Sequence, residues 1–481
     1  MPFGRNEAHC LFFADMSTLI FWAIGALLVF IPLPFGGVEE WAIFGLQAAV
    51  AVLLALHIGT DKPRSSVFSV PLFFKVLFAV FFGIAVLQVI PLPLPVLDAI
   101  SPRSVEIHAG AAVGPAAWRT LSLAPNLSVY ELLKYLSYAV FAFLVFRSVR
   151  TKKQAEILVL LMILAGVFQA VYGLVMLFGG SAEVLGWKNR WYQGSAFGTF
   201  VNRNHYSAFL EMVFPLAVGY LLAKANFFSL KKGISFREKI LWFGQERLGK
   251  AAILILLSVV IGVGVFFSRC RSGILIFFLT VFLMVIVLSA GGRGVEGERR
   301  RGQRARRVIR TVALIIIFSV LLIGIKPILE RFSLEVLEAE GRPILYKNTI
   351  ELIKDYPLSG TGLGTYIHSY PKYEQKYVRG ITDHAHNDYL EVLAENGLMG
   401  GGCLIAAAFG ALGWLFVKWG RRRDYFVKGI GLGCMAGIAA ILIHSLTDFS
   451  LRMPANAVYC MTLYALALKT VGLKERTKTL A

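Results

Sequence analysis

Apolar runs about as long as a bilayer is thick recur along the whole chain, and no other feature restricts its fold as strongly. A helix needs about 20 mostly apolar residues to cross the hydrocarbon core of a membrane. Twelve segments approach or meet that length. They lie at residues 16–31, 38–57, 72–90, 130–146, 155–178, 205–223, 250–267, 272–290, 309–325, 386–417, 426–446 and 455–471. The sequence therefore predicts an all-α polytopic membrane protein with about twelve transmembrane helices.

The composition supports this class of protein and excludes others. Of 481 residues, 57% are hydrophobic and only 16% are charged, whereas soluble domains average about half apolar and a quarter charged. A soluble enzyme, a disordered chain and a secreted disulfide scaffold are excluded. The five cysteines form no CxxC pair, so we expect neither a disulfide framework nor a cysteine-bound metal. The first run continues into IPLPFGG without a small-residue cleavage site, which favours an uncleaved anchor over a signal peptide.

The distribution of lysine and arginine predicts the orientation of the chain. If the N-terminus is cytoplasmic, the inside segments carry most of the basic residues, as the positive-inside rule requires. Both termini are then cytoplasmic, and four loops face outward, at 91–129, 180–203, 326–384 and 447–454. The net charge of +20 lies in short segments between apolar runs, so we expect no nucleic-acid partner. The Gly- and Arg-rich segment 291–310 is expected to be a solvated, partly disordered loop near anionic lipid.

The longest outward loop contains the string GRPILYKNTIELIKDYPLSGTGLGTY. From Pro343 onward, apolar residues recur at helical spacing, which predicts a short amphipathic helix ending at Pro357. Arg342 then lies at the start of this helix, where unpaired backbone N–H groups and the helix dipole favour an anion, phosphate above all. The alternative for this residue alone is an arginine on a solvated loop.

A second outward string, FFSRCRSG at 266–273, separates two apolar runs. Its arginines, Arg269 and Arg271, run against the inside bias of the other basic residues. Ser272 and Gly273 open the next helix, which predicts a second anion site at a helix N-terminus. The alternative is that both arginines extend from a helix end towards the aqueous interface.

A third string, TDHAHNDYLEVLAENGLMGG at 382–401, carries two histidines. If it is helical, His384 shares one stripe with Asp388 and Glu391, and His386 lies about 200° away, so the two cannot share a metal. If the HAH segment is extended, both histidines point the same way and a metal is possible. No third ligand is suitably spaced, and HExxH is absent. The better role for a histidine here is a base, oriented by Asp388 or Glu391.

Two further strings add polar groups at the outer ends of apolar runs. GTFVNRNHYSAFLEM at 198–212 carries residues that would line a substrate cavity because such groups are costly to bury unpaired: Asn202, Asn204, His205 and Glu211. HSLTDFSLRMPANA at 444–457 places His444 opposite Asp448, as either a structural hydrogen bond or a catalytic pair. Arginines for an anion and a histidine for a proton, on one face of a membrane, indicate a diphosphate-linked lipid as substrate.

These strings resemble the bacterial O-antigen ligase and polymerase superfamily, membrane glycosyltransferases of the C type. The signature of its ligases is a His-Asn pair, nine residues and GxxGG. Here His386 and Asn387 are followed by nine residues and then by Gly397, Gly400 and Gly401. The other strings are also similar to family segments and occur in the family's order. The resemblance covers roughly residues 195–460 and is weak in the first five runs.

The resemblance implies an inverting, metal-independent transfer without cofactor, from an undecaprenyl-diphosphate-linked glycan at the periplasmic face of the bacterial inner membrane. The family's diphosphate-binding arginines correspond to Arg342 and to Arg269 or Arg271. Its essential histidine corresponds to His386, with His384 and Asn387 as neighbouring catalytic candidates. The expected acceptor is lipid A–core, as for a ligase, or a carrier-linked glycan, as for an O-antigen or exopolysaccharide polymerase. A lipid-linked glycan transporter is the alternative from another class.

The same reasoning divides the chain into four parts. Residues 1–194 hold about five N-terminal spans with their periplasmic loops, and residues 195–325 hold the spans of a ligase-like core. Residues 326–384 form a large, partly helical periplasmic loop between the ninth and tenth spans. Residues 385–481 hold the C-terminal spans. The possible substrate cavity is expected from residues of the second and last parts, namely Asn202, Asn204, His205, Glu211, Asp388, Glu391 and His444.

Overall fold

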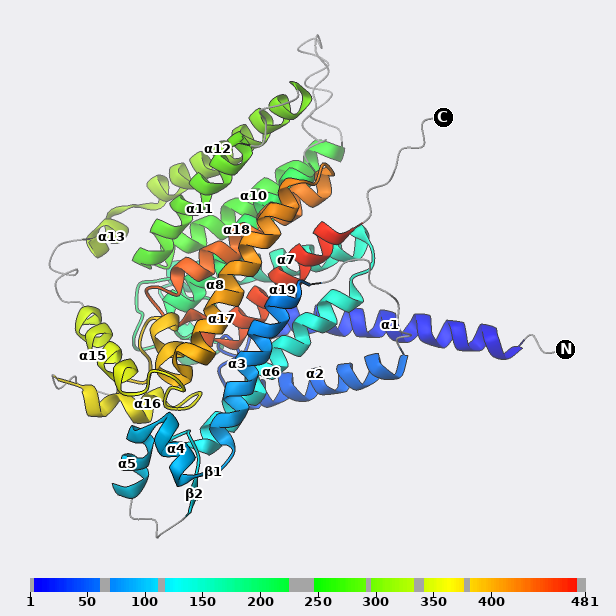
Figure 1. Cartoon of the computed structure of the whole chain (residues 1–481). Helices are drawn as coiled ribbons and strands as arrows, with labels where there is room; N and C mark the ends of the chain where they lie inside the picture. Colours follow the sequence, from blue (N-terminus) through cyan, green and yellow to red (C-terminus); the bar gives the residue numbers. More distant parts are fainter. Residues whose placement is uncertain are drawn as a thin grey trace, which may run out of the picture.

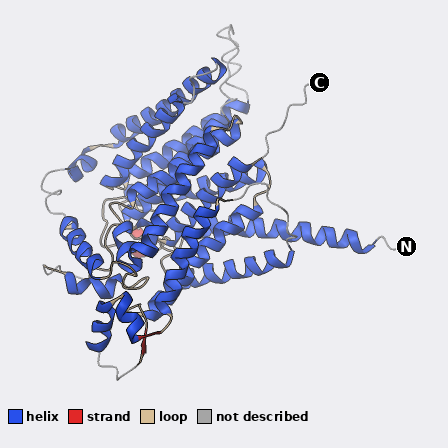
Figure 2. Ribbon diagram, viewed as in Figure 1, coloured by secondary structure: helices blue, strands red, loops and turns tan. Residues whose placement is uncertain are grey.

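The computed structural model describes residues 4–60, 70–110, 117–224, 246–290, 296–332, 341–375 and 381–473. Long helices dominate this part of the chain, and its strands form only two short antiparallel pairs (Figures 1 and 2). One pair joins β1 (Leu92–Pro93) to β2 (Trp118–Arg119) and the other joins β3 (Glu183–Val184) to β4 (Trp187–Lys188). The all-α fold class is therefore confirmed.

Each of the twelve predicted runs falls on a long helix. The helices are α1 (Gly4–Phe30), α2 (Glu40–Thr60), α3 (Leu72–Val89), α6 (Pro125–Ser148), α7 (Lys152–Phe178), α8 (Arg203–Ala223), α10 (Glu246–Phe267), α11 (Arg271–Ala290), α12 (Glu296–Ile323), α17 (Asp388–Gly420), α18 (Tyr425–His444) and α19 (Pro454–Gly472). Within the described residues, nine helices are long and apolar enough to cross a membrane. A tenth span results if α12 and the bent segment after it count together. The chain is a multi-pass membrane protein, and twelve spans remain a prediction.

Helix α8 forms the centre of the bundle against α18. In the apolar stretch of α8 that could span the membrane, 94% of the residues are buried inside the protein. The two helices approach closely because glycines face each other: a Cβ on Gly219 would lie 2.5 Å from the carbonyl oxygen of Gly429, and one on Gly433 would lie 2.8 Å from that of Pro215. Small residues at helix interfaces allow such close packing in membranes. This core fixes the outer ends of α8 and α18, where the candidate site lies.

The Arg-rich segment after α11 differs from its prediction. Residues 296–310 belong to α12 and are helical, so the expected loop is wrong there, while 291–295 lie outside the described residues. Arginine, glutamate and glutamine favour helices. Ala305 and Ile309, one turn apart, are buried in the hydrophobic core, and this packing holds the helix against its neighbours.

The segment between α12 and α17 is partly helical. It contains α13 (Lys326–Leu329), η2 (Glu330–Phe332), α15 (Arg342–Asp355), α16 (Tyr366–Ser369) and η3 (Tyr370–Tyr373). Helix α15 confirms the short helix predicted from the sequence, including the position of Arg342 at its first residue. Nearer the N-terminus, α4 (Leu94–Ile100) and α5 (Pro102–Gly110) lie beside β1 and β2 (Figure 1). Of these short elements, α15 and α16 pack against α17.

Candidate active site

Helix α17 begins one residue after Asn387, which caps it. The Asn387 side-chain oxygen accepts the backbone N–H groups of Tyr389 and Leu390 at 3.0 and 3.1 Å. Its side-chain amide donates to the carbonyl of Leu446 at 3.0 Å. Both ends of the side chain are therefore engaged in the fold, and Asn387 orients the residue before it. The helical alternative for the HAH segment is wrong, because residues 384–386 precede the helix in a non-helical stretch.

His386 has a left-handed backbone, with φ at 47°. Among the described residues, four non-glycine residues have positive φ, and Arg269 is another of them. Such conformations persist only where the surrounding structure holds them, and they concentrate at functional sites. Tyr346 of α15 donates its hydroxyl to the His386 carbonyl at 2.9 Å. The His386 side chain is 35% exposed, and its Nδ1 lies 3.2 Å from Oδ1 of Asp448.

The Asp448 carboxylate is buried and brings several candidate residues together. Asn204 donates to its Oδ2 at 2.6 Å, Arg342 lies 3.6 Å from that oxygen, and His205 lies 3.7 Å from Oδ1. Burial alone would raise the pKa of Asp448, but the neighbouring His205 and the hydrogen bond with His386 hold it well below its usual range. With Asp448 ionised, Nδ1–H of His386 donates to it, and Nε2 keeps its lone pair.

His384 has a different partner from His386. Its Nδ1 lies 2.7 Å from Oε1 of Glu391, so Glu391 orients His384. Of the two histidines that Glu391 was predicted to orient, it therefore contacts His384. Burial opposes the charged imidazole, but the Glu391 charge and hydrogen bond raise the pKa of His384 above its ordinary value. His384 is therefore disposed to be a cation, whereas the free lone pair of His386 suits a base.

Phe449 holds three imidazoles around one aromatic ring. His384 stacks on it with centroids 4.0 Å apart, while His386 and His205 meet it edge-on at 4.9 and 4.6 Å. The two histidines of the HAH segment thus lie on the same side of the chain. In the described part of the chain, however, the structure contains no group of three His, Cys, Asp or Glu residues placed to bind a metal.

Arg452 fixes the carboxylates behind the histidines. Its Nε lies 3.2 Å from Oε1 of Glu391 and its Nη2 lies 2.5 Å from Oε2 of Glu395, and all three side chains are buried. Asp388 instead accepts hydrogen bonds from Ser445 at 2.7 Å and from the Leu451 backbone at 3.1 Å. The prediction that Asp388 orients a histidine is therefore wrong: Asp388 anchors the segment that follows α18.

Arg342 lies beside Asp448, and Arg203, Arg269 and Arg331 lie near one another; we call these four residues the arginine cluster. Arg203 interacts electrostatically with Arg331 and Arg269, and its guanidinium lies 5.3 Å from the ring centre of Tyr192. Tyr192 interacts in turn with Arg203, Arg342 and Asp448. The predicted residues Arg269 and Arg342 thus lie in the same region as Arg203 and Arg331, which the sequence did not point out. Cations that are held close together create a site for an anion.

The alternatives within FFSRCRSG differ in their surroundings. Arg269 lies beside the loop that precedes α8, where its Nη1 is 3.2 Å from the position that a Cβ on Gly194 would take. Arg271 is the first residue of α11. The next residue, Ser272, accepts a hydrogen bond from Thr447 at 2.8 Å, which joins the start of α11 to the segment that carries Asp448.

Other predicted cavity residues support the fold. Glu211 and His444 form a fully buried pair with 3.0 Å between Oε2 and Nδ1, linking α8 to α18. The expected side-chain contact between His444 and Asp448 is wrong, since only their backbones bond, at 3.1 Å. Asn202 caps α8 through the backbone of Asn204 at 2.8 Å. Of the predicted cavity residues, Asn204 and His205 therefore lie at Asp448, whereas Glu211 and His444 form a closed pair at the helix interface.

The glycine signature marks a break in α17. Gly397 has φ 60° and ψ −174°, and a Cβ there would lie 2.1 Å from the carbonyl oxygen of Leu358. The backbone of Leu398 bonds to the carbonyl of Pro357 at 2.8 Å, which joins the break to the loop after α15. Gln88 of α3 donates to the carbonyls of Ser359 and Glu395, each at 2.7 Å. Thus the N-terminal part of the chain, where no motif was found, also braces the site.

An apolar cavity of about 390 Å³ adjoins the buried side of this group. Side chains of α3, α6, α17 and α19 line it, with Phe74, Phe78 and Phe81 on one wall. Asp388 and Arg452 also line it. A cavity of this composition inside a membrane suits a hydrocarbon chain.

The comparison with known families agrees with the resemblance seen in the sequence. Residues 253–405 match the O-antigen ligase family. The match includes Arg269, Arg271, Arg342, His384 and His386. No curated protein matches the chain significantly. Members of the matched family are glycosyltransferase-type enzymes, acting as ligases or polymerases. Residues 253–405 of this multi-pass membrane protein are accordingly an O-antigen ligase domain.

Proposed function

We propose that the protein transfers a glycan from an undecaprenyl-diphosphate carrier to a sugar hydroxyl of lipid A–core at the periplasmic face of the inner membrane. One observation carries the proposal: the buried carboxylate of Asp448 contacts both His386 and Arg342, at 3.2 and 3.6 Å. It places a base next to a site for an anion, as this reaction requires. The match to the O-antigen ligase family supports the same reaction class.

In the proposed reaction, Nε2 of His386 takes the proton of the acceptor hydroxyl. The hydroxyl oxygen attacks the anomeric carbon from the face opposite the diphosphate. The new carbon–oxygen bond forms as the bond to the diphosphate breaks, so the configuration inverts and the diphosphate leaves with the electron pair. The ionised Asp448 stabilises the imidazolium that forms on His386, and Asn387 holds the backbone that carries it.

The arginine cluster is proposed to stabilise the departing diphosphate. Of the two arginines in FFSRCRSG, we assign this role to Arg269, because it interacts with Arg203 of the cluster. His384 contributes a positive charge, because Glu391 favours its protonated form. Transfer is thus proposed to need no metal ion. The apolar cavity beside Asp388 provides space for a lipid chain.

The test is transfer in vitro by the purified full-length protein, with diphosphate-linked glycan, lipid A–core and EDTA. The variant His386→Ala removes the base, and His368→Ala, on an exposed histidine of α16, is the matched control. Capped lipid A–core from the wild type and the control, but not from His386→Ala, supports the proposal. Longer carrier-linked chains without capping identify a polymerase instead. Lipid movement without any transfer would point to a transporter and contradict the proposal.

A further inference from the structure

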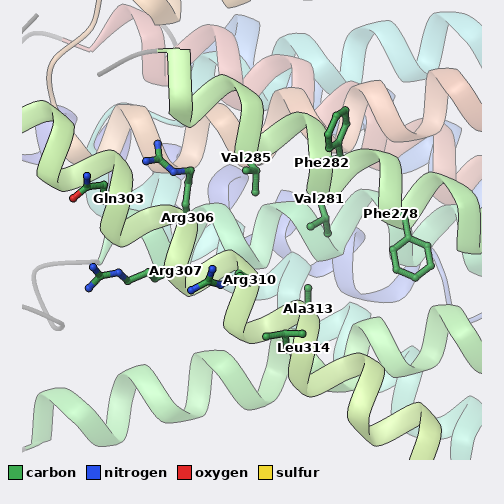
Figure 3. Close-up of a pocket in the computed structure, with 10 residues that line it drawn as sticks. All are labelled: Phe278, Val281, Phe282, Val285, Gln303, Arg306, Arg307, Arg310, Ala313 and Leu314. Carbon is green, nitrogen blue, oxygen red and sulfur yellow. The ribbon is translucent and has the colours of Figure 1, made fainter. Parts of the chain in front are cut away.

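A groove of about 620 Å³ lies between α11 and α12, away from the candidate active site (Figure 3). Its walls combine two kinds of side chain. The basic wall comes from α12 and the apolar wall mostly from α11: Arg306, Arg307, Arg310, Phe278, Phe282 and Val285. The proposed transfer reaction uses none of these residues.

The groove changes character along its length. The arginines lie nearer the Ala290 end of α11 and the Glu296 end of α12, and Phe278 lies nearer the start of α11 (Figure 3). The other end of α11 is fixed at the candidate site, where Ser272 bonds to Thr447 at 2.8 Å. Since α11 has 20 residues, its ends lie about 30 Å apart. The arginines are therefore at the membrane face opposite His386.

No carboxylate neutralises these arginines within the described side chains. Arg306 is half-buried, and its Nη1 lies 3.4 Å from the carbonyl oxygen of Leu288, a weak contact. Arg307 and Arg310 are exposed. Three guanidinium groups on adjacent turns of one helix form a concentrated positive site, and guanidinium groups bind phosphate with two parallel hydrogen bonds.

From this positive site, the groove continues along its apolar wall towards the middle of the membrane. Phe278 and Phe282 are 44% and 60% exposed, and Leu314 of α12 is 57% exposed. An amphiphile with one charged end matches this order of groups. Basic pockets between transmembrane helices at a membrane face are known to hold anionic lipid headgroups.

We propose that this groove binds one anionic glycerophospholipid, with its phosphate at Arg306, Arg307 and Arg310 and an acyl chain against Phe278 and Phe282. The site is separate from the proposed donor and acceptor sites and lies in the opposite leaflet. A lipid bound there would hold α12 against α11.

The experiment is native mass spectrometry of the full-length protein, titrated in detergent with phosphatidylglycerol or phosphatidylcholine. One variant combines Arg306→Gln, Arg307→Gln and Arg310→Gln. Its matched control is Arg304→Gln, an exposed arginine of the same helix that does not line the groove. A second variant, Ala313→Phe, fills the apolar part and keeps the charges. Size-exclusion elution checks that each variant is folded.

We expect the wild type and Arg304→Gln to bind one phosphatidylglycerol at least about tenfold more tightly than phosphatidylcholine. The triple variant should lose this preference, and Ala313→Phe should weaken binding of both lipids. Equal affinity of the wild type for the two lipids would overturn the proposal, as would unchanged binding by the triple variant. Displacement of the lipid by inorganic phosphate, with no effect of Ala313→Phe, would identify a simple anion site and also overturn it.

Discussion

Asp448 places its Oδ1 3.2 Å from Nδ1 of His386, although 62 residues of chain separate the two. The contact joins the segment after α18 to the segment before α17. It also fixes the tautomer of His386, because the ionised Asp448 accepts from Nδ1–H. The free Nε2 then has the lone pair that a base needs, and the carboxylate stabilises the cation that forms when it takes a proton.

Replacing Asp448 with asparagine should therefore reduce turnover strongly. General base catalysis contributes about 10²–10⁴-fold, and kcat of Asp448→Asn should fall within that range. KM should change much less, since the amide preserves the shape of the side chain. The transfer assay measures both constants, and Asp98→Asn, on an exposed residue of α4, is the matched control. Because Asp448 also contacts Asn204 and Arg342, Tm is measured in parallel; normal turnover would remove Asp448 from the mechanism.

Replacing Arg342 with lysine should impair turnover more than stability. Lysine keeps the charge but cannot donate two parallel hydrogen bonds to a phosphate. We expect kcat/KM to fall by at least about tenfold, with Tm close to the wild-type value. Removing a different cation from the same helix, in Lys347→Ala, tests whether charge alone matters, because Lys347 is exposed. Wild-type turnover in Arg342→Lys would exclude Arg342 from the diphosphate site.

Replacing Arg452 with methionine should destabilise the fold. It would leave Glu391 and Glu395, each 1% exposed, without their guanidinium partner. Breaking a buried ion pair from one side costs about 3–5 kcal/mol. Thermal unfolding in detergent should show a clear fall in Tm. The exposed Arg423 gives the control Arg423→Met, and adding Glu395→Gln to Arg452→Met should restore part of the loss. Equal Tm values for the two single variants would contradict this account.

A pair of glycine substitutions on α17 should have opposite effects. In Gly397→Ala the new Cβ would lie 2.1 Å from the Leu358 carbonyl oxygen at a positive φ, so the break and the loop behind it must shift. We expect a loss of about 1–3 kcal/mol. Nothing lies within 4 Å of a Cβ on Gly402, so Gly402→Ala should be neutral or stabilise the helix by up to about 1 kcal/mol. Thermal unfolding compares them directly, and an unstrained Gly397→Ala would show that the break is dispensable.

The pair of His384 and Glu391 should make stability depend on pH. The folded pKa of His384 is raised, so its contribution is complete below the ordinary histidine pKa of about 6.5 and is lost as pH rises through the folded value. The difference in Tm between wild type and His384→Gln should therefore be larger at pH 6 than at pH 9. His368→Gln, on an exposed histidine, is the control. A difference that grows with pH would reverse the assigned sign.

The local features of the site could be read from the sequence because their causes are local. Hydropathy places the long helices, and spacing predicts α15 with Arg342 at its start. The pairing across the bundle could not be read in this way. The spacing predicted Asp448 as a partner for His444, four residues before it. In the structure α8 packs on α18, and His444 pairs with Glu211 instead. In the sequence, Asp448 could have been noticed only as a carboxylate just beyond the end of an apolar run.

The N-terminal part of the chain shows the same limit. Gln88 uses one side-chain amide to bond two carbonyls on separate segments, Ser359 and Glu395. A single glutamine in an apolar run has no spacing or partner pattern to mark it. Arg452 was similarly hidden in the short segment between α18 and α19, because its two carboxylates lie on α17. Such residues become recognisable only when the fold brings distant segments together.

The position of Arg452 late in the chain has a consequence for biosynthesis. Glu391 and Glu395 are translated before the guanidinium that neutralises them in the finished protein. Until Arg452 emerges, the inserted helix α17 must keep these acids protonated or in contact with water. Closure of the end of the bundle that carries the candidate site therefore waits for the hairpin of α18 and α19. A nascent chain arrested after α18 would hold Glu395 without its guanidinium partner, while Glu391 would keep only His384.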